Sequence, residues 1–133
     1  MIVVDAGAWA HALADPSPVG QASGRALGQD LGWTMPPHGP LETLRTIRRY
    51  EHAGLITPVA AEKHAEAIAG TNFTIIPAQA WMIHSIWNLR HNINPYDAAY
   101  VAIAQRFGYR LITLDERLVR AAERLGVEVR IPA

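Results

Sequence analysis

Short runs of apolar, mostly β-branched residues alternate with longer stretches of helical periodicity along the chain, and this alternation constrains the fold more than any other feature. Residues 2–4 form one such run, as expected of a strand that is buried on both faces. Parallel strands need a crossover connection, which is usually a helix. The pattern therefore predicts an α/β fold, a three-layer α/β/α domain with a mainly parallel sheet of four to five strands flanked by helices.

We expect one domain over residues 1–133, because half of the residues are apolar and the chain is too short for two cores of ordinary size. The expected strands cover residues 2–4, 32–35, 72–76, 110–114 and 127–131. The expected helices cover residues 6–14, 19–30, 41–53, 58–69, 78–90, 95–107 and 116–125. The segment 15–20 is expected to end the first helix, and residues 35–40 are expected to be a connection.

Composition narrows the classes of partner. The 12 acidic and 12 basic residues balance, so any polyanion must be held by a local arrangement of charge. The absence of cysteine excludes disulfides and thiolate metal sites. No run of 18 apolar residues and no signal-like start is present. We therefore expect a soluble, cytoplasmic protein without a membrane partner.

Four acidic residues fall at expected helix starts. Asp5 and Asp115 each directly follow an expected strand. Asp97 is the third helical residue after Asn94, and Glu42 is expected to have the same place in its own helix, with Gly39 as the N-cap. Because parallel strands end at one edge of a sheet, the starts of the following helices share that edge. The four carboxylates are therefore expected to converge.

Each acid taken alone has a structural explanation, since an acidic residue in the first helical turn favours the helix dipole or caps free N–H groups. The set of four has a different consequence. Carboxylates that lie within a few ångströms of one another repel, and protons or a cation must offset their charge. Mg²⁺ and Mn²⁺ prefer oxygen ligands and keep waters that a substrate can displace. Convergence therefore predicts a metal site for Mg²⁺ or Mn²⁺.

Other chemistry has less support in the sequence. It contains no HExxH, G-x-S-x-G, G-x-G-x-x-G or P-loop motif. Arg90 precedes the Asp97 helix, and its role is open between substrate contact and capping of a helix end. Trp81 and Trp87 are expected in the core or at a subunit interface rather than stacked on bases.

Four segments together resemble the PIN-domain ribonucleases of the VapC toxin type, and the resemblance extends from the first strand to the last helix. These segments are IVVDAGAWA, PPHGPLETLRTIRR, NINPYDAAYVAIAQ and RLITLDERLVRAA. Each motif alone is loose, but their order and spacing match the family.

The resemblance implies a specific set of site residues and partners. The family's acids carry over to Asp5, Glu42, Asp97 and Asp115, which would line a pocket and hold Mg²⁺ or Mn²⁺ for hydrolysis of RNA. Thr113 would support the site with its hydroxyl. The family also implies a homodimer and a VapB-like antitoxin that silences the enzyme.

One departure from the family pattern leaves an alternative open. Family members commonly carry Ser or Thr two residues after the first acid, where this chain has Gly7. The alternative is a catalytically weakened PIN domain that serves as an RNA- or protein-binding module.

Two other classes of small α/β protein are disfavoured by the sequence. A receiver domain would need a lysine late in the chain, and Lys63 lies in its middle. A haloacid-type phosphotransferase would need an aspartate at position 7.

Overall fold

The computed structural model describes every residue from Met1 to Ala133 and contains five strands and seven helices. The strands are β1 (Ile2–Val4), β2 (Trp33–Met35), β3 (Thr74–Ile75), β4 (Arg110–Ile112) and β5 (Val129–Arg130). The helices are α1 (Ala6–Ala14), α2 (Pro18–Gly28), α3 (Gly39–His52), α4 (Pro58–Gly70), α5 (Ala80–Asn88), α6 (Pro95–Phe107) and α7 (Glu116–Arg124).

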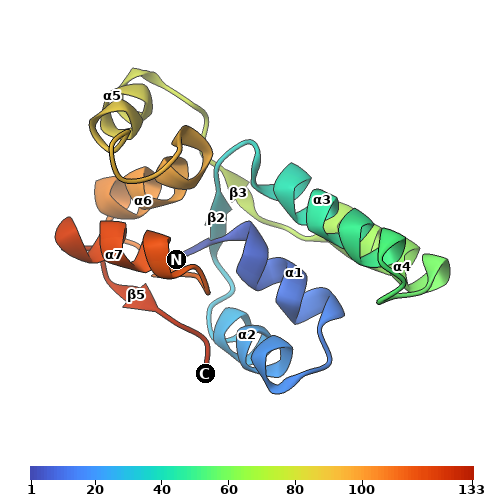
Figure 1. Ribbon diagram of the computed structural model, residues 1–133. Helices are drawn as coiled ribbons and strands as arrows, with labels where there is room; N and C mark the ends of the chain where they lie inside the picture. The colour runs from blue at the N-terminus through green and yellow to red at the C-terminus, as the bar shows by residue number, and fades with distance from the viewer.

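The strands form one sheet in the order β3-β2-β1-β4-β5, and every neighbouring pair is parallel. From β1 the chain moves to one edge through β2 and β3, and later to the other edge through β4 and β5. Right-handed crossovers in opposite directions put their helices on opposite faces of the sheet. Figure 1 shows this division, with α1, α3 and α4 on one side of the strands and α5, α6 and α7 on the other. The predicted α/β class with a parallel sheet is confirmed.

Helix α6 packs against the centre of the sheet, where it contacts β1 and β4. Every residue from Ala98 to Ala104 is buried, and four of these seven are alanines, which allow close approach of the helix to the strands. Asn94 caps the start of this helix, because its side chain accepts a hydrogen bond from the N–H of Asp97. Gly108 ends it with a φ of 70°, a left-handed conformation that glycine adopts without strain. Local chemistry at both ends therefore determines where α6 begins and ends.

Several expected boundaries are wrong. Strand β4 ends at Ile112, so Thr113 and Leu114 separate it from Asp115. The edge strands β3 and β5 each have two residues, because only these residues pair with their single neighbouring strand. The segment 15–20 ends α1 as expected, and α2 begins at Pro18, one residue before the expected start.

Helix α3 also begins earlier than expected. The N–H of Glu42 bonds to the carbonyl of His38, which makes His38 the N-cap and Glu42 the fourth helical residue. Gly39 and Pro40 therefore belong to the helix rather than to the connection before it. The earlier start leaves Glu42 within the first turn and a half of α3.

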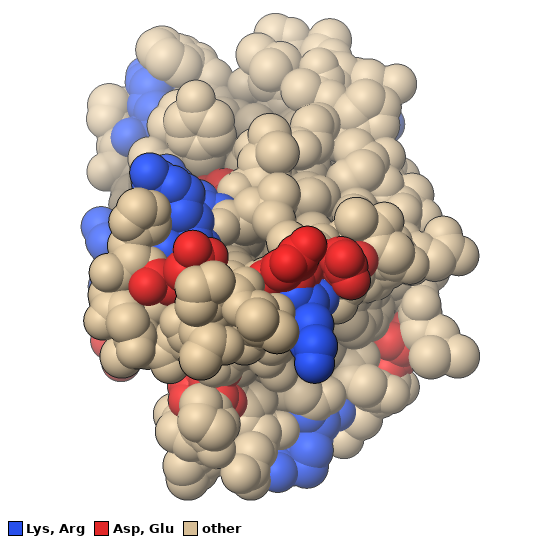
Figure 2. All heavy atoms as spheres, turned by 90° about the vertical axis from the view of Figure 1, so that its right-hand side faces the viewer, with Lys and Arg blue, Asp and Glu red and all other residues tan.

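The surface carries charge in dispersed groups. Figure 2 views the side formed by α3 and α4, and it shows small separate clusters of acidic and basic side chains with no broad field of one sign. None of the seven helices has the length and apolar character that crossing a membrane would require.

Candidate active site

The four acidic residues singled out above line one pocket, and they come from four different segments of the chain. The pocket has a volume of about 350 Å³ and lies at the ends of β1 and β4, where Asp5, Glu42, Asp97 and Asp115 meet. The strand order reverses here, because β2 and β3 lie on one side of β1 whereas β4 and β5 lie on the other. Open α/β sheets commonly bind ligands at such a point. Convergence of the four acids is therefore a property of the fold.

Asp5 is the most deeply placed of the four, with 8% of its surface exposed. It is the N-cap residue of α1, but its side chain makes no capping hydrogen bond. Burial raises the pKa of Asp5, against the effect of a hydrogen bond from Thr113, and the charges of Asp97, Glu42 and Asp115 add to the rise, so that the pKa is about 7. The carboxyl groups are thus close enough to influence one another electrostatically.

Thr113 connects Asp5 to the end of β4. Its buried hydroxyl donates to Oδ2 of Asp5 over 2.8 Å and accepts from the N–H of Asp115 over 3.0 Å. Asp115 in turn caps α7, because its Oδ1 accepts from the N–H of Arg117 over 2.8 Å. One hydroxyl therefore positions two of the four acids relative to each other.

Asp97 is held by its own helix cap. The side-chain amide of Asn94 donates to Oδ2 of Asp97 over 2.9 Å, and the N–H of Asp97 donates back to Asn94 over 3.0 Å. Burial raises the pKa of Asp97, and so does the charge of Asp115. The hydrogen bond from Asn94 and the charges of Arg117 and His38 oppose this rise.

Glu42 is oriented by two aromatic side chains that sequence reasoning missed. The hydroxyl of Tyr100 donates to Oε1 of Glu42 over 2.8 Å, and Nε2 of His38 lies 3.7 Å from the same oxygen. Burial, together with the charges of Asp5 and Glu42, raises the pKa of Tyr100. A signal was present in the sequence, because Tyr100 lies three residues after Asp97, and thus on the same side of the helix, in a run from Ala98 to Ala104 that is otherwise small and aliphatic.

Two arginines accompany the acids. Arg45 and Arg49 line the same pocket from α3, and Nη2 of Arg45 is 4.0 Å from Oε2 of Glu42. Arg90 has a different position. Its guanidinium donates to the carbonyl of Trp87 over 2.9 Å, lies 4.5 Å from the centre of the Trp87 ring, and is not among the residues of the acid pocket.

The donor set of the pocket suits a hard divalent cation, because it consists of carboxylate oxygens whose charges a cation would offset. The raised pKa of Asp5 shows that its ionised form is disfavoured in the pocket, and a bound cation would stabilise that form. In this conformation, however, no three acidic or histidine side chains lie close enough together to hold a metal ion. The chemistry of the residues fits Mg²⁺ or Mn²⁺, while binding one would require the carboxylates to move closer together. The ligand role of each acid remains a prediction.

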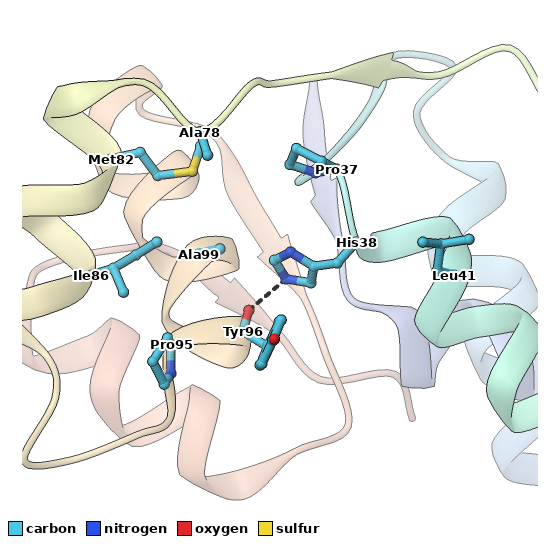
Figure 3. Close-up of a pocket in the computed structure, with 9 residues that line it drawn as sticks. All are labelled: Pro37, His38, Leu41, Ala78, Met82, Ile86, Pro95, Tyr96 and Ala99. Atoms are coloured by element: carbon cyan, nitrogen blue, oxygen red, sulfur yellow. Dashed lines mark hydrogen bonds between the residues drawn. The ribbon is translucent and has the colours of Figure 1, made fainter.

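An apolar groove adjoins the acids. It has a volume of about 480 Å³, and Figure 3 shows it between α5, α6 and the start of α3, with Nε2 of His38 donating a hydrogen bond of 2.8 Å to the carbonyl oxygen of Tyr96. Its lining residues are Pro37, His38, Leu41, Ala78, Met82, Ile86, Pro95, Tyr96 and Ala99. His38, Leu41 and Tyr96 also line a second pocket, of about 490 Å³, that contains Glu42 and Asp97. The apolar groove therefore leads directly to two of the acids.

Comparison with known proteins gives consistent matches. The family model described as PIN domain matches residues 2–124. Ribonuclease VapC12 of Mycobacterium tuberculosis (strain ATCC 25618 / H37Rv) is 32% identical over 125 residues, which cover 91% of this chain and 92% of the relative.

Two solved structures resemble the fold. Mycobacterium tuberculosis VapC20, described as a sarcin-ricin loop cleaving toxin, has a TM-score of 0.70 at 19% identity and covers 91% of this chain and 95% of its own. A toxin-antitoxin complex from Klebsiella pneumoniae has a TM-score of 0.71 at 16% identity, with 100% of this chain and 98% of that chain covered. At these identities the two structures show a common fold.

Proposed function

Because the chain belongs to the PIN domain family, we propose that it is a Mg²⁺- or Mn²⁺-dependent endoribonuclease and the toxin of a VapBC-type toxin–antitoxin pair. The observation that carries the proposal is the meeting of Asp5, Glu42, Asp97 and Asp115 in one pocket at the carboxyl edge of the sheet. The name of the relative VapC12, a ribonuclease, supports the choice of reaction. The proposed place of action is the cytoplasm.

Asp5, Asp97 and Asp115 are the residues that would hold the cation, and Glu42 would either join them or orient the attacking water. A divalent cation, when bound, supplies a Lewis acid that lowers the pKa of water and offsets negative charge on the scissile phosphate. The chain itself contributes orientation. Thr113 keeps the carboxyl of Asp5 facing the end of β4.

Glu42 is the residue best suited to accept a proton from the attacking water. Tyr100 binds Oε1 of its carboxylate, while Oε2 has no hydrogen-bond partner from the protein and lies 4.0 Å from Nη2 of Arg45. Arg45 and Arg49 line the same pocket and carry the planar guanidinium groups that pair well with phosphate oxygens. These two arginines would hold the phosphate while Glu42 orients the nucleophile.

The proposed protein partner is a VapB-like antitoxin, and the proposed assembly is a homodimer. The fold is shared with a toxin-antitoxin complex from Klebsiella pneumoniae. The apolar groove beside the acids supports an inhibitor of this kind. A segment bound across Met82 and Ile86 would pass His38 (Figure 3), which also lines the pocket that contains Glu42.

The alternative function is a catalytically weakened PIN domain that binds RNA or protein. Gly7 favours it, because this residue brings no hydroxyl to Asp5, and so does the separation of the carboxylates. A cleavage assay distinguishes the two functions, since the alternative predicts binding of RNA without hydrolysis.

The test uses purified protein, total RNA and Mg²⁺ or Mn²⁺. We expect cleavage by the wild type that EDTA abolishes, and loss of cleavage in Asp97→Asn with an unchanged circular dichroism spectrum. Glu66→Gln is the matched control, because it removes an exposed carboxylate from α4, away from the pocket. Cleavage by Asp97→Asn at the wild-type rate would overturn the proposal.

A further inference from the structure

A separate cleft, of about 230 Å³, lies away from the acid pocket, between the connection from α5 to α6 and one face of α7. Basic and amide side chains dominate its lining, and it contains no acidic residue and no Phe, Tyr or Trp. The lining residues are His91, Asn92, Arg117, Arg120, Ala121 and Arg124.

None of the three arginines of this cleft is in an ion pair with an acidic side chain. Their spacing of three and four residues puts them on one side of α7, and all three are exposed. The ion pairs of the structure are elsewhere, and none includes Arg117, Arg120 or Arg124. Glu116 and Glu123 belong to the same helix, but neither forms an ion pair with any arginine of the cleft. In a chain with balanced charge, this is a local concentration of positive charge.

The cleft and the acid pocket share no lining residue, but Arg117 of the cleft contacts the acids of the pocket. The N–H of Arg117 donates to Asp115, and its charge acts on Asp97, whose pKa it lowers. From Arg117 the row extends to Arg124 along about 10 Å of helix, at a rise of about 1.5 Å per residue. Since nucleic-acid phosphates follow one another at about 3.4 Å per nucleotide along a stacked strand, the row is long enough for more than one phosphate.

An anionic substrate needs such a surface. Four carboxylates line the acid pocket, with Arg45 and Arg49 beside them, and the face of the molecule seen in Figure 2 has no broad positive field that would attract a polyanion. Guanidinium groups bind phosphate oxygens in pairs and keep their charge at any physiological pH. A row of arginines that begins beside the acids would hold the strand while the bond to be cut lies over the carboxylates.

We propose that the cleft of Arg117, Arg120 and Arg124 is a phosphate-binding subsite for the backbone of the RNA strand on one side of the cleaved bond. The proposal rests on the ribonuclease function and adds the location of substrate binding to it. The cleft contains three arginines and no Phe, Tyr or Trp, so it is suited to hold the backbone by charge rather than to stack on bases.

The test measures binding separately from cleavage. A short fluorescein-labelled single-stranded RNA of mixed sequence is titrated with protein in EDTA, and anisotropy is followed at several salt concentrations. For Arg120→Gln/Arg124→Gln we expect affinity to fall by ~10-fold and the slope of log affinity against log salt to shrink by about 1.4, the value for two phosphate contacts on a single strand. Arg25→Gln/Arg48→Gln is the matched control, because both arginines are exposed, form no ion pair and line neither pocket.

Each outcome is informative. Equal losses of RNA affinity in the two double variants would show that only the net charge of the protein matters. Unchanged affinity in Arg120→Gln/Arg124→Gln would show that RNA does not occupy the cleft. Either result overturns the subsite, as does failure of the wild type to bind RNA at low salt. If Arg120→Gln/Arg124→Gln cleaves RNA with the KM of the wild type, the subsite is overturned and the ribonuclease function stands. Binding that depends on the cleft, without any cleavage, would support the subsite and contradict the ribonuclease function.

Discussion

The hydroxyl of Tyr100 donates a hydrogen bond of 2.8 Å to Glu42, across 58 positions of sequence. Tyr100 is fully buried on α6, whereas Glu42 lies at the start of α3 and faces the acid pocket. The contact therefore ties a carboxylate of the pocket to the core of the protein. Tyr100 acts through Glu42 and is a positioning residue.

Tyr100→Phe should lower kcat by about tenfold and leave KM nearly unchanged, because loss of one hydrogen bond to a charged group is worth about 1.5 kcal/mol or more. Tyr96→Phe is the control, since Tyr96 is exposed, its hydroxyl forms no hydrogen bond, and phenylalanine keeps both the backbone carbonyl and the ring that contact His38. RNA cleavage kinetics on both variants check the prediction. A lower melting temperature of Tyr100→Phe without a change in kcat would limit Tyr100 to a structural role.

Asp5 should make the metal-free protein less stable as pH rises. Its pKa is raised from 3.8 to about 7 in the folded protein, so between these values the folded protein keeps a proton that the unfolded chain has released. The contribution of Asp5 to the free energy of unfolding is therefore fully present below 3.8 and is lost as pH rises towards 7, by up to about 1.4 kcal/mol per pH unit.

Urea unfolding of the wild type and Asp5→Asn in EDTA, over a pH series that brackets 3.8 and 7, measures this contribution. The free energy of unfolding of Asp5→Asn should exceed that of the wild type by an amount that grows through that pH interval and then levels off. Asp15 does not confuse the comparison, because its pKa is lowered to about 2 by hydrogen bonds from Ser17 and His11. A constant difference between the two proteins would show that Asp5 titrates normally.

Divalent cations should raise the melting temperature, and most strongly above pH 7, where Asp5 is ionised and the carboxylates repel one another most. A cation that binds only the folded protein stabilises it by about 2.7 kcal/mol at a concentration 100 times its Kd. Differential scanning fluorimetry with Mg²⁺ or Mn²⁺, against NaCl of equal ionic strength, measures the shift. The shift should disappear in Asp97→Asn and persist in Glu66→Gln, and its persistence in both variants would place the cation elsewhere.

Gly7→Ser should raise cleavage activity above that of Gly7→Ala. A Cβ at position 7 would lie 3.5 Å from Oδ2 of Asp5, which is ordinary contact, so a serine hydroxyl fits within reach of the carboxylate. Alanine gains only helix propensity, worth about 1 kcal/mol, and so isolates the effect of the hydroxyl. Equal activity of the two variants would show that a hydroxyl at this position is not limiting.

Features set by local chemistry could be predicted from the sequence. The helix over residues 6–14 and the start of α6 at Asn94 and Pro95 agree with the structure, because a strand end and a capping side chain act within a few residues. The meeting of the acids could also be predicted, since parallel strands must end at a common edge.

Features set by tertiary pairing could not be predicted. Residues 72–76 have the composition of a strand, yet only Thr74 and Ile75 pair with β2. The spacing of Tyr100 from Asp97 puts it on the side of the acids, but its contact with Glu42 depends on the packing of α6 near α3, which that spacing does not specify. The cleft of α7 was missed for a similar reason, because its arginines gain significance only when the connection before α6 lies beside them.

The pairing of β1 with β4 joins Asp5 to Thr113, which lie 108 positions apart. A nascent chain that has not yet reached β4 carries three of the four acids but lacks Asp115, Thr113 and one of the two neighbours of its central strand. The proposed active site is therefore incomplete during most of synthesis and can form only after nearly the whole chain has emerged. An antitoxin of the proposed pair has that interval in which to be made before the proposed toxin is active.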